Sequence, residues 1–525
     1  MTGQTIRRLI LGAITLVVIA LLGTSLLGSL GEPQITDRLE LYQTDLLLHA
    51  TELGEGSGDG NAAADRADTY KALLGNDPLG EALKQYQKVR QSAATNLKQF
   101  ETRLQQFKPD PAPVTATPLP NRSKRITEPQ QQLKTAIQQQ RDLINQLDLR
   151  MGILQAQQDK TAAALTTWTE LVNRLGDRLE VQPLSATAKV LNGLWSDPPR
   201  LLPDAEPLIQ KNLEGWFRYK SLSRLYELQQ RSDVLTVLKA NEQEVAQQTL
   251  IKLALVGTLP AIGGIVGLIL LVVMGIRAFR SRAAAPENLT WDVPWSWEMI
   301  LQVLIVGFFF MGQIVIPLVV GASGISFAAF GIRARAAYTL TYYLLMASSG
   351  LAVLYFSIRS FFPLPEGWFR PTGKRSWFIW GVGGYFVALP LMLVISLLNQ
   401  QIWQGQGGSN PLLQIVLEEG DPIALSLFFF TAAIAAPVFE EIFFRGFLLP
   451  SLTRYMPVGA AIGLSALIFA TAHLSLSEVL PLTVLGSVLG FVYTRSRGLL
   501  APMLLHSLWN SVTMLGLFLL GSGVK

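Results

Sequence analysis

The sequence of 525 residues contains no cysteine. Disulfide bonds, thiolate ligands for metal ions and cysteine nucleophiles are therefore excluded. Charged residues are also few, at 15% of the chain, whereas soluble globular proteins carry roughly a quarter. Hydrophobic residues make up 50% of the chain, and the mean hydropathy is +0.32. This composition excludes a single soluble globule and also a disordered chain.

Uncharged apolar runs recur along the chain, several of them as long as the ~20 residues that a bilayer crossing needs. Basic residues flank these runs, so a membrane accounts for the net charge of +5 without a nucleic-acid partner. The sequence therefore predicts an all-α, polytopic membrane protein with a helical domain outside the cytoplasm. Nine spans are predicted, at residues 9–30, 253–276, 299–322, 337–358, 377–398, 423–439, 458–474, 479–493 and 499–520.

Arginines at the ends of the first two spans predict the orientation. Arg7 and Arg8 precede the first span, and Arg277, Arg280 and Arg282 follow the second. The positive-inside rule places both groups in the cytoplasm, so the segment between the two spans is predicted to lie outside. The first span is long for the apolar part of a signal peptide and lacks an Ala-x-Ala site, which favours a retained anchor.

Two later loops agree with this orientation and one disagrees. The loop 359–375 is net basic and is predicted to be cytoplasmic, whereas the loop 399–422 has acids but no Lys or Arg and is predicted to be external. Arg333 and Arg335, however, fall on a loop predicted to be external.

The segment between the first two spans is polar and rich in Gln, Leu and Ala, which favours a helical domain. A glycine-rich acidic loop at 54–60 and a proline-rich linker at 109–120 are predicted to interrupt it. The predicted domains are an N-terminal anchor (1–30), an extracytoplasmic helical domain (31–250), a second transmembrane helix with a basic cytoplasmic linker (251–298) and a polytopic core (299–525).

Ionisable side chains within a membrane span are costly to bury, so each is a candidate functional group. Glu440 and Glu441 directly follow an uncharged run. On a continuing helix, Glu441 and Arg445 can pair because they are four residues apart, while Glu440 points about 100° away. Arg445 would then hold Glu441 ionised and leave Glu440 as a general base in apolar surroundings. The competing interpretation is a salt bridge at a helix end beside a solvated glutamate.

The chain has only three histidines: His49, His473 and His506. His473 lies four residues after Phe469, and His506 lies four residues before Asn510. A single histidine on an apolar face is commonly a core residue with its hydrogen bonds satisfied. Two histidines in separate membrane helices, both downstream of the glutamate pair, favour a shared site. His49 lies in the polar region and receives no role.

Together these side chains supply what peptide hydrolysis requires. Glu440 is predicted to deprotonate a water molecule that His473 helps to position. His506 and Asn510 are predicted to donate hydrogen bonds to the oxyanion, a role worth a few kcal/mol per donor. Two imidazoles and a carboxylate could also bind zinc. The helical H-E-x-x-H pattern is absent, so no cofactor is predicted and zinc is not favoured.

Three motifs, Glu440-Glu441-x-x-x-Arg445, Phe469-x-x-x-His473 and His506-x-x-x-Asn510, occur in this order. They resemble those of the CPBP family, the CAAX prenyl-protease and bacteriocin-processing intramembrane endopeptidases, also called the Abi family. The resemblance covers residues 425–515 and implies a glutamate-dependent endopeptidase whose site opens to the cytoplasm. The catalytic residues that it implies, taken with the chemistry above, are Glu440, Glu441, Arg445, His473, His506 and Asn510. The expected partners are a membrane-associated protein or peptide substrate and the bilayer.

The sequence has partial features of three other functions. Gly321-Ala322-Ser323-Gly324 resembles the nucleophile motif of rhomboid serine proteases, but there the helix with His and Asn precedes the serine. An aspartyl membrane protease needs two intramembrane aspartates, and Asp421 stands alone. The alternative outside proteolysis is a transporter, or a non-catalytic scaffold that binds partners through its external domain. No internal repeat of the kind found in many transporters is evident.

A shared site makes one demand on the helices. If all of them were straight and complete, Glu440 would lie near the cytoplasmic end of its span and His473 near the opposite end of the next. At least one of these helices is therefore predicted to be short, tilted or re-entrant, or to have displaced boundaries.

Overall fold

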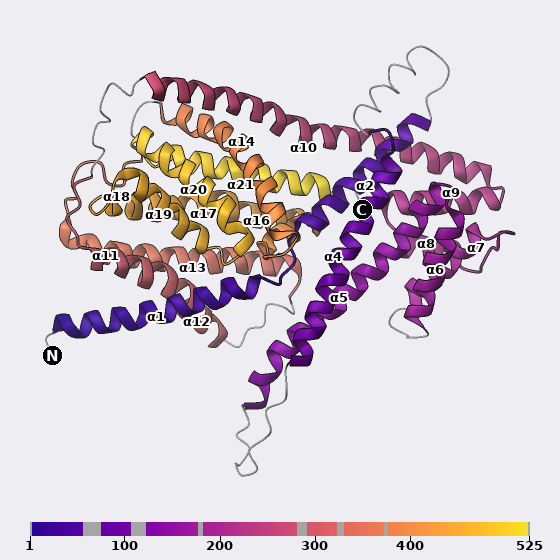
Figure 1. Cartoon of the computed structure of the whole chain (residues 1–525), viewed down its shortest axis with the longest axis horizontal. Coiled ribbons are helices and arrows are strands. Elements are labelled where there is room, and N and C mark those ends of the chain that lie inside the picture. The colour runs from indigo at the N-terminus through magenta and orange to yellow at the C-terminus, as the bar shows by residue number, and fades with distance from the viewer. Residues whose placement is uncertain are drawn as a thin grey trace, which may run out of the picture. The chain divides into compact units, whose positions relative to one another are not determined.

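The computed structural model describes residues 3–55, 75–106, 122–176, 182–280, 291–322, 330–371 and 376–522. Within these ranges the chain is helical and contains no strand, which confirms the all-α class (Figure 1). The proline-rich linker, most of the loop 54–60 and Ser323 of the rhomboid-like motif lie outside the described residues.

The chain divides into two compact units, which we describe separately. The membrane unit comprises Met1–Ile35 and Val256–Phe518, and the polar unit comprises Thr36–Leu255 and Leu519–Lys525. The long helix α10 (Ser232–Arg280) belongs to both.

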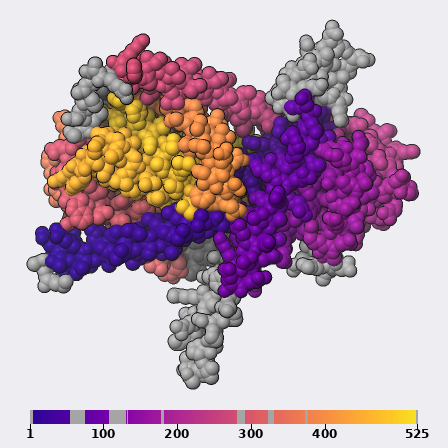
Figure 2. Space-filling model, in the orientation of Figure 1, coloured from indigo at the N-terminus to yellow at the C-terminus, as the bar shows by residue number. Residues whose placement is uncertain are grey.

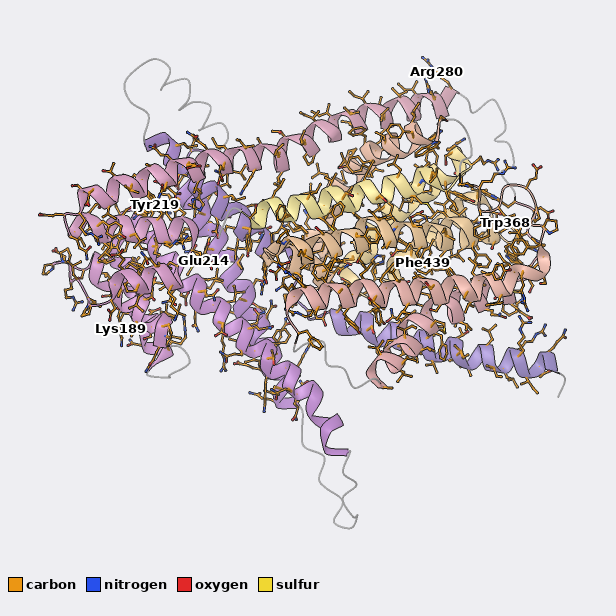
Figure 3. The ribbon with its side chains drawn as sticks, turned by 180° about the vertical axis from the view of Figure 1, so that it is seen from behind. Lys189, Glu214, Tyr219, Arg280, Trp368 and Phe439 are labelled. Atoms are coloured by element: carbon orange, nitrogen blue, oxygen red, sulfur yellow. The ribbon has the colours of Figure 1, made fainter. Side chains whose placement is uncertain are left out.

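The polar unit is a helical domain with its own core. Its helices are α2 (Thr36–Glu55), α4 (Pro78–Gln106), α5 (Arg122–Gln157), α6 (Thr161–Leu175), α7 (Gln182–Trp195), α8 (Ala205–Asn212), α9 (Gly215–Leu228) and the first part of α10. Large aromatic side chains fill its core, and Tyr219, labelled in Figure 3, is buried among them. The buried carboxylate of Asp45 accepts hydrogen bonds from Tyr86 at 2.5 Å and from Arg150 at 3.3 Å. The unit therefore stabilises itself by packing and buried polar contacts, as a chain without cysteine must.

The membrane unit contains the remaining helices. They are α1 (Gly3–Ser29), the end of α10, α11 (Trp297–Leu301), η3 (Gln302–Val315), α12 (Ile316–Ala322), α13 (Ile332–Ile358), η5 (Arg359–Phe361), α14 (Trp377–Trp403), α15 (Pro411–Glu418), α16 (Pro422–Phe430), η6 (Thr431–Ala435), α17 (Ala436–Glu441), η7 (Ile442–Leu448), α18 (Leu449–Leu452), α19 (Val458–Thr471), α20 (Leu476–Ser496) and α21 (Leu500–Gly521). The segments η3, η6 and η7 are π-helical and continue their neighbours without a break.

Eight of the described helices are long and apolar enough to cross a membrane. This finding confirms a multi-pass integral membrane protein. They are Gln4–Ser29, Ser232–Arg280, Trp297–Ala322, Ile332–Phe361, Trp377–Trp403, Pro422–Leu452, Leu476–Ser496 and Leu500–Gly521.

The predicted ninth span, at 458–474, is wrong in length. Helix α19 has only 14 residues, or about 21 Å at 1.5 Å per residue, against a hydrocarbon core of about 30 Å. The chain turns back after Thr471, so His473 lies in a turn and not at the end of a full crossing. This is a short helix of the kind that a shared site was predicted to require.

The predicted boundary of the span at 423–439 is also wrong. The helix continues through Glu440 and Glu441 to Leu452, because the sequence after the acids is again apolar and aromatic. The glutamate pair therefore lies inside a helix and not at its end. Phe439, one residue earlier, is labelled within the helices of this unit in Figure 3.

Candidate active site

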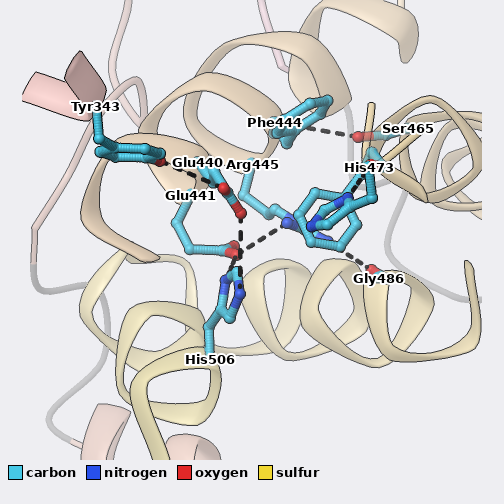
Figure 4. A network of polar contacts seen from close by, with 10 residues as sticks. Tyr343, Glu440, Glu441, Phe444, Arg445, Ser465, His473, Gly486 and His506 are labelled. Atoms are coloured by element: carbon cyan, nitrogen blue, oxygen red, sulfur yellow. Dashed lines mark hydrogen bonds and ion pairs between the residues drawn. The ribbon is translucent and has the colours of Figure 1, made fainter. Parts of the chain in front are cut away.

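The carboxylate of Glu441 is the centre of a buried polar network (Figure 4). Its side chain is 0% exposed and that of Arg445 is 1% exposed. One oxygen of Glu441 accepts hydrogen bonds from Arg445 and from His506 Nδ1, each at 2.8 Å. The predicted pairing of Glu441 with Arg445 is present. The competing helix-end salt bridge beside solvent is excluded by this burial.

Arg445 is held on three sides. Besides Glu441, its guanidinium donates to the carbonyl of Gly486 in α20 at 3.0 Å and lies 4.7 Å from the centre of the Phe469 ring. A Cβ atom at Gly486 would come within 3.3 Å of this guanidinium and 3.0 Å of the Ala466 Cβ atom. Glycine at position 486 therefore allows α20 to approach the ion pair closely. Such contacts offset part of the desolvation of a buried pair.

His506 lies between the two glutamates. Because Arg445 pairs with Glu441 and keeps it an acceptor, we assign the proton of His506 to Nδ1, which donates to Glu441. The other nitrogen, Nε2, lies 3.9 Å from Oε2 of Glu440. Glu441 thus orients an imidazole whose free nitrogen faces Glu440.

Glu440 is the more accessible acid of the pair. Its side chain is 15% exposed, against 0% for Glu441. The hydroxyl of Tyr343, on α13, donates to Glu440 Oε1 at 3.3 Å. Tyr343 was not predicted from the sequence, because it lies in an apolar run without a motif. Only the packing of α13 against the helix that carries the two glutamates reveals its contact.

Phe469 connects the two histidines. Its ring is 0% exposed and lies 5.0 Å from the ring of His473 and 5.8 Å from that of His506. His473 Nδ1 donates to the Phe469 carbonyl at 3.0 Å, which leaves Nε2 as its free nitrogen. Among the described residues, no hydrogen bond joins His473 to either glutamate. The structure places His473 beside the site through Phe469 and not through a direct polar contact.

Asn510 bonds to the π-helical turn η6, which lies in the helix that carries the two glutamates. In η6 the N–H of Ala436 bonds to the carbonyl of Thr431, five residues back, and not to that of Ala432. The Ala432 carbonyl is therefore free, and it accepts a hydrogen bond from the Asn510 amide at 2.7 Å. Such π-helical turns are frequent at functional sites. One amide hydrogen of Asn510 is thus engaged by the Ala432 carbonyl.

The six predicted residues differ in how closely they meet. One network of polar contacts joins Glu440, Glu441, Arg445 and His506. The other two residues lie beside it: His473 bonds to the Phe469 carbonyl, and Asn510 bonds to the Ala432 carbonyl. In the part of the chain that the structure describes, no group of three or more His, Asp or Glu side chains could hold a metal ion.

Comparison with known families agrees with the three motifs. Residues 422–512 match the family model described as "Type II CAAX prenyl endopeptidase Rce1-like". We call this matched segment the Rce1-like domain. This Rce1-like domain begins with α16 and ends within α21, so it includes all six predicted residues. The family resemblance inferred from the motifs is confirmed.

A curated relative also matches part of the chain. The chain is 25% identical over 137 residues to the Bacillus subtilis (strain 168) protein named "Putative membrane peptidase YdiL". The match covers 26% of this chain and 55% of the relative, so the chain spans about half the length of that protein. No solved structure matches the chain significantly.

Proposed function

We propose that the membrane unit is an intramembrane endopeptidase that hydrolyses membrane-associated proteins or peptides by a water molecule activated at Glu440. The observation that carries the proposal is the position of His506, which bonds to Glu441 with one nitrogen and faces Glu440 with the other. Membership of residues 422–512 in a family of endopeptidases supports it.

The contacts of the two acids assign their roles. Glu441 is buried and already accepts from Arg445 and His506, so it has no access to a water molecule. Glu440 has a partly exposed carboxylate with one long hydrogen bond, from Tyr343. Glu440 is therefore the general base, and Glu441 orients His506 by accepting a hydrogen bond from Nδ1.

The reaction then proceeds in two steps. The Glu440 carboxylate takes a proton from water while the oxygen of that water attacks the peptide carbonyl carbon. In this step His506 carries a second proton, on Nε2, beside the one that Nδ1 donates to Glu441. The oxyanion receives hydrogen bonds from this Nε2–H and from the second amide hydrogen of Asn510, and His473 helps to position the water. Glu440 next gives its proton to the amide nitrogen, and the carbon–nitrogen bond breaks. The steps use no metal ion.

Charge at the two ends of the membrane unit supports a cytoplasmic N-terminus. Arg8 pairs with Glu298 at 2.7 Å, Arg454 donates to the Trp295 carbonyl, and Arg497 lies over the ring of Trp291. The start of α1, the start of α11 and the connections α18–α19 and α20–α21 thus share one arginine-rich end. The positive-inside rule places this end in the cytoplasm. By the same rule, the polar unit is proposed to lie outside.

The opposite end of the unit is acidic. Glu418 ends α15, Glu419 and Asp421 lie between α15 and α16, and Glu478 lies in the first turn of α20. Arg333 disagreed with the orientation in the sequence, but its guanidinium pairs with Asp421 at 2.8 Å. This pairing neutralises a positive charge that would otherwise oppose an external position.

The experiment that tests the function is a comparison of membrane proteomes between cells with the wild-type protein and cells with Glu440→Gln. Fragments with new N-termini are expected only with the wild type. Glu366→Gln is the matched control, because Glu366 is a highly exposed acid whose side chain is 96% accessible. Identical fragments with Glu440→Gln at equal protein level would refute the hydrolase and favour the partner-binding alternative.

A further inference from the structure

Three segments of the membrane unit meet beside His473, and two of them lie outside the Rce1-like domain. We call them the clasp: residues 29–35 at the end of α1, residues 404–409 after α14, and residues 472–477 between α19 and α20. The first two segments precede residue 422, where the family match begins. The clasp is therefore a feature that the matched domain does not supply by itself.

The first two segments pair through their backbones. Pro33 and Gln406 form an antiparallel bridge. The N–H of Gln34 donates to the Gly405 carbonyl at 2.8 Å, and the N–H of Gly408 donates to the Glu32 carbonyl at 2.9 Å. Hydrogen bonds between residues that are far apart in the sequence thus fix the end of α1 to the loop after α14.

These two segments together cap the N-terminus of α20. The first N–H groups of a helix have no partner inside it. Here the N–H of Leu476 donates to the Ser29 hydroxyl at 3.0 Å, and the N–H of Ser477 donates to the Gly407 carbonyl at 3.1 Å. The Ser475 side chain, at the usual capping position, instead donates to Gly407 at 3.0 Å. The start of α20 is therefore capped by other segments of the chain.

His473 lies directly before this capped start. Only residues 472–475 connect the end of α19 at Thr471 to Leu476. Within them, Leu474 has a φ of +61°, a left-handed conformation that costs a non-glycine residue energy and persists only where the surroundings enforce it. The clasp supplies those surroundings, because it fixes the chain immediately after Leu474.

The far end of α1 is also attached to the membrane unit. Arg8 pairs with Glu298, and Arg7 donates to Gln302 at 2.5 Å. Between the two ends, α1 lies on the surface of the unit (Figure 2), yet Val18 is only 2% exposed and belongs to the core. Helix α1 is thus attached at both ends and in the middle, which is more than membrane anchoring requires.

We propose that Ser29 is a positioning residue: through its bond to Leu476, helix α1 holds the turn that carries His473 in place for hydrolysis. Its effect on catalysis rests on the proposed function, whereas its effect on the turn does not. Gly407 allows the loop after α14 to approach the start of α20 closely. A Cβ atom at this position would come within 2.9 Å of the Ser477 Cβ atom, and the φ of +99° at Gly407 favours glycine.

Hydrogen exchange of the full-length protein tests the positioning without any substrate. Ser29→Ala is expected to raise the amide exchange of residues 472–478 about fivefold, the effect of losing one ordinary hydrogen bond. Ser25→Ala is the matched control, because it removes an exposed hydroxyl from the same helix. Ser29→Thr keeps a hydroxyl and should restore slow exchange. Equal exchange in Ser29→Ala and wild type would overturn the proposal.

The rate at which Glu440-dependent fragments appear tests the consequence for catalysis. Ser29→Ala is expected to lower this rate about tenfold by misplacing His473, and Ser29→Thr should recover it. In a His473→Ala background, Ser29→Ala should have no further effect, because residues that act through one another are not additive. If Ser29→Ala lowers the rate of fragment formation as much in the His473→Ala background as in the wild type, Ser29 does not act through His473. A wild-type rate of fragment formation in Glu440→Gln would refute the proposed function. The hydrogen-exchange result would then still decide whether the clasp holds the turn in place.

Discussion

Arg445 and Glu441 form an ion pair at 2.8 Å whose side chains are almost completely removed from solvent. The two residues lie one helical turn apart. They connect three helices, because Arg445 donates a hydrogen bond to the Gly486 carbonyl of α20 and Glu441 accepts one from His506 of α21. A buried pair of this kind does not by itself stabilise a fold, since desolvation opposes the Coulomb attraction. Here the pair also fixes the direction of the His506 imidazole, through the hydrogen bond from Nδ1 to Glu441.

Removal of the arginine should strongly destabilise the protein. Arg445→Met leaves the Glu441 carboxylate buried with no cation beside it, and breaking a buried pair in this way costs about 3–5 kcal/mol. Arg370→Met is the control, because Arg370 pairs with Glu366 at the surface. Thermal unfolding in detergent should show a large loss for the first variant and almost none for the second. Equal melting temperatures would contradict the network.

Tyr343→Phe should slow hydrolysis without unfolding the protein. The variant keeps the ring and removes only the hydroxyl that donates to Glu440. We expect a loss of about fivefold in the rate of fragment formation, the value of one hydrogen bond. Tyr342→Phe is a matched control, because the neighbouring hydroxyl bonds to the Gly312 carbonyl and not to an acid. An equal effect of both variants would show that Tyr343 does not act on Glu440.

Gly267→Ala should weaken the packing of α10 on α14. An added Cβ atom would come within 1.8 Å of the Phe386 carbonyl oxygen, so the helices must separate. Overpacking of this kind costs about 1–3 kcal/mol. Gly264→Ala is the control, because a Cβ atom there meets nothing within 4 Å. Thermal unfolding that is unchanged in both variants would contradict the close approach of the two helices.

The acidic end of the membrane unit should be sensitive to acid. The N–H of Ala424 at the start of α16, and then Arg333, lower the pKa of the Asp421 carboxyl. A lowered pKa means that the contribution to stability is complete above the ordinary value, about pH 4, and is lost as the pH falls through the lowered value. The melting temperature of Asp421→Asn should therefore change less between neutral and acidic pH than that of the wild type. The same acid dependence in both proteins would contradict this role.

Spacing along the helix was enough to predict the central pair of the site. Glu441 and Arg445 meet because residues four apart share a helix face. The motifs predicted that His473 and His506 share a site with Glu440, and Nε2 of His506 faces Glu440 at 3.9 Å. The interpretation of Glu440 as the freer acid agrees with its contacts, although its catalytic role stays a prediction.

Other features depend on tertiary packing and left no local signal. The bond of Asn510 to Ala432 depends on a π-helical turn, whose sequence, Thr431–Ala435, reads as ordinary apolar helix. The helix end was placed at Phe439 because two acids normally end an apolar span, but burial of Arg445 beside Glu441 allows the helix to continue. The contact of Ser29 with Leu476 joins residues 447 positions apart, beyond any local pattern.

The most direct test of the account is a double-mutant cycle on Glu440 and His506, with the rate of fragment formation as the readout. Each single change, Glu440→Gln and His506→Gln, should lower the rate by about 10²–10⁴-fold, as expected for loss of general acid–base catalysis. Because both groups act in one pocket, the double variant should be no slower than the slower single variant. Losses that multiply, or a Glu440→Gln variant that cleaves at the wild-type rate, would contradict a shared site in which Glu440 activates water.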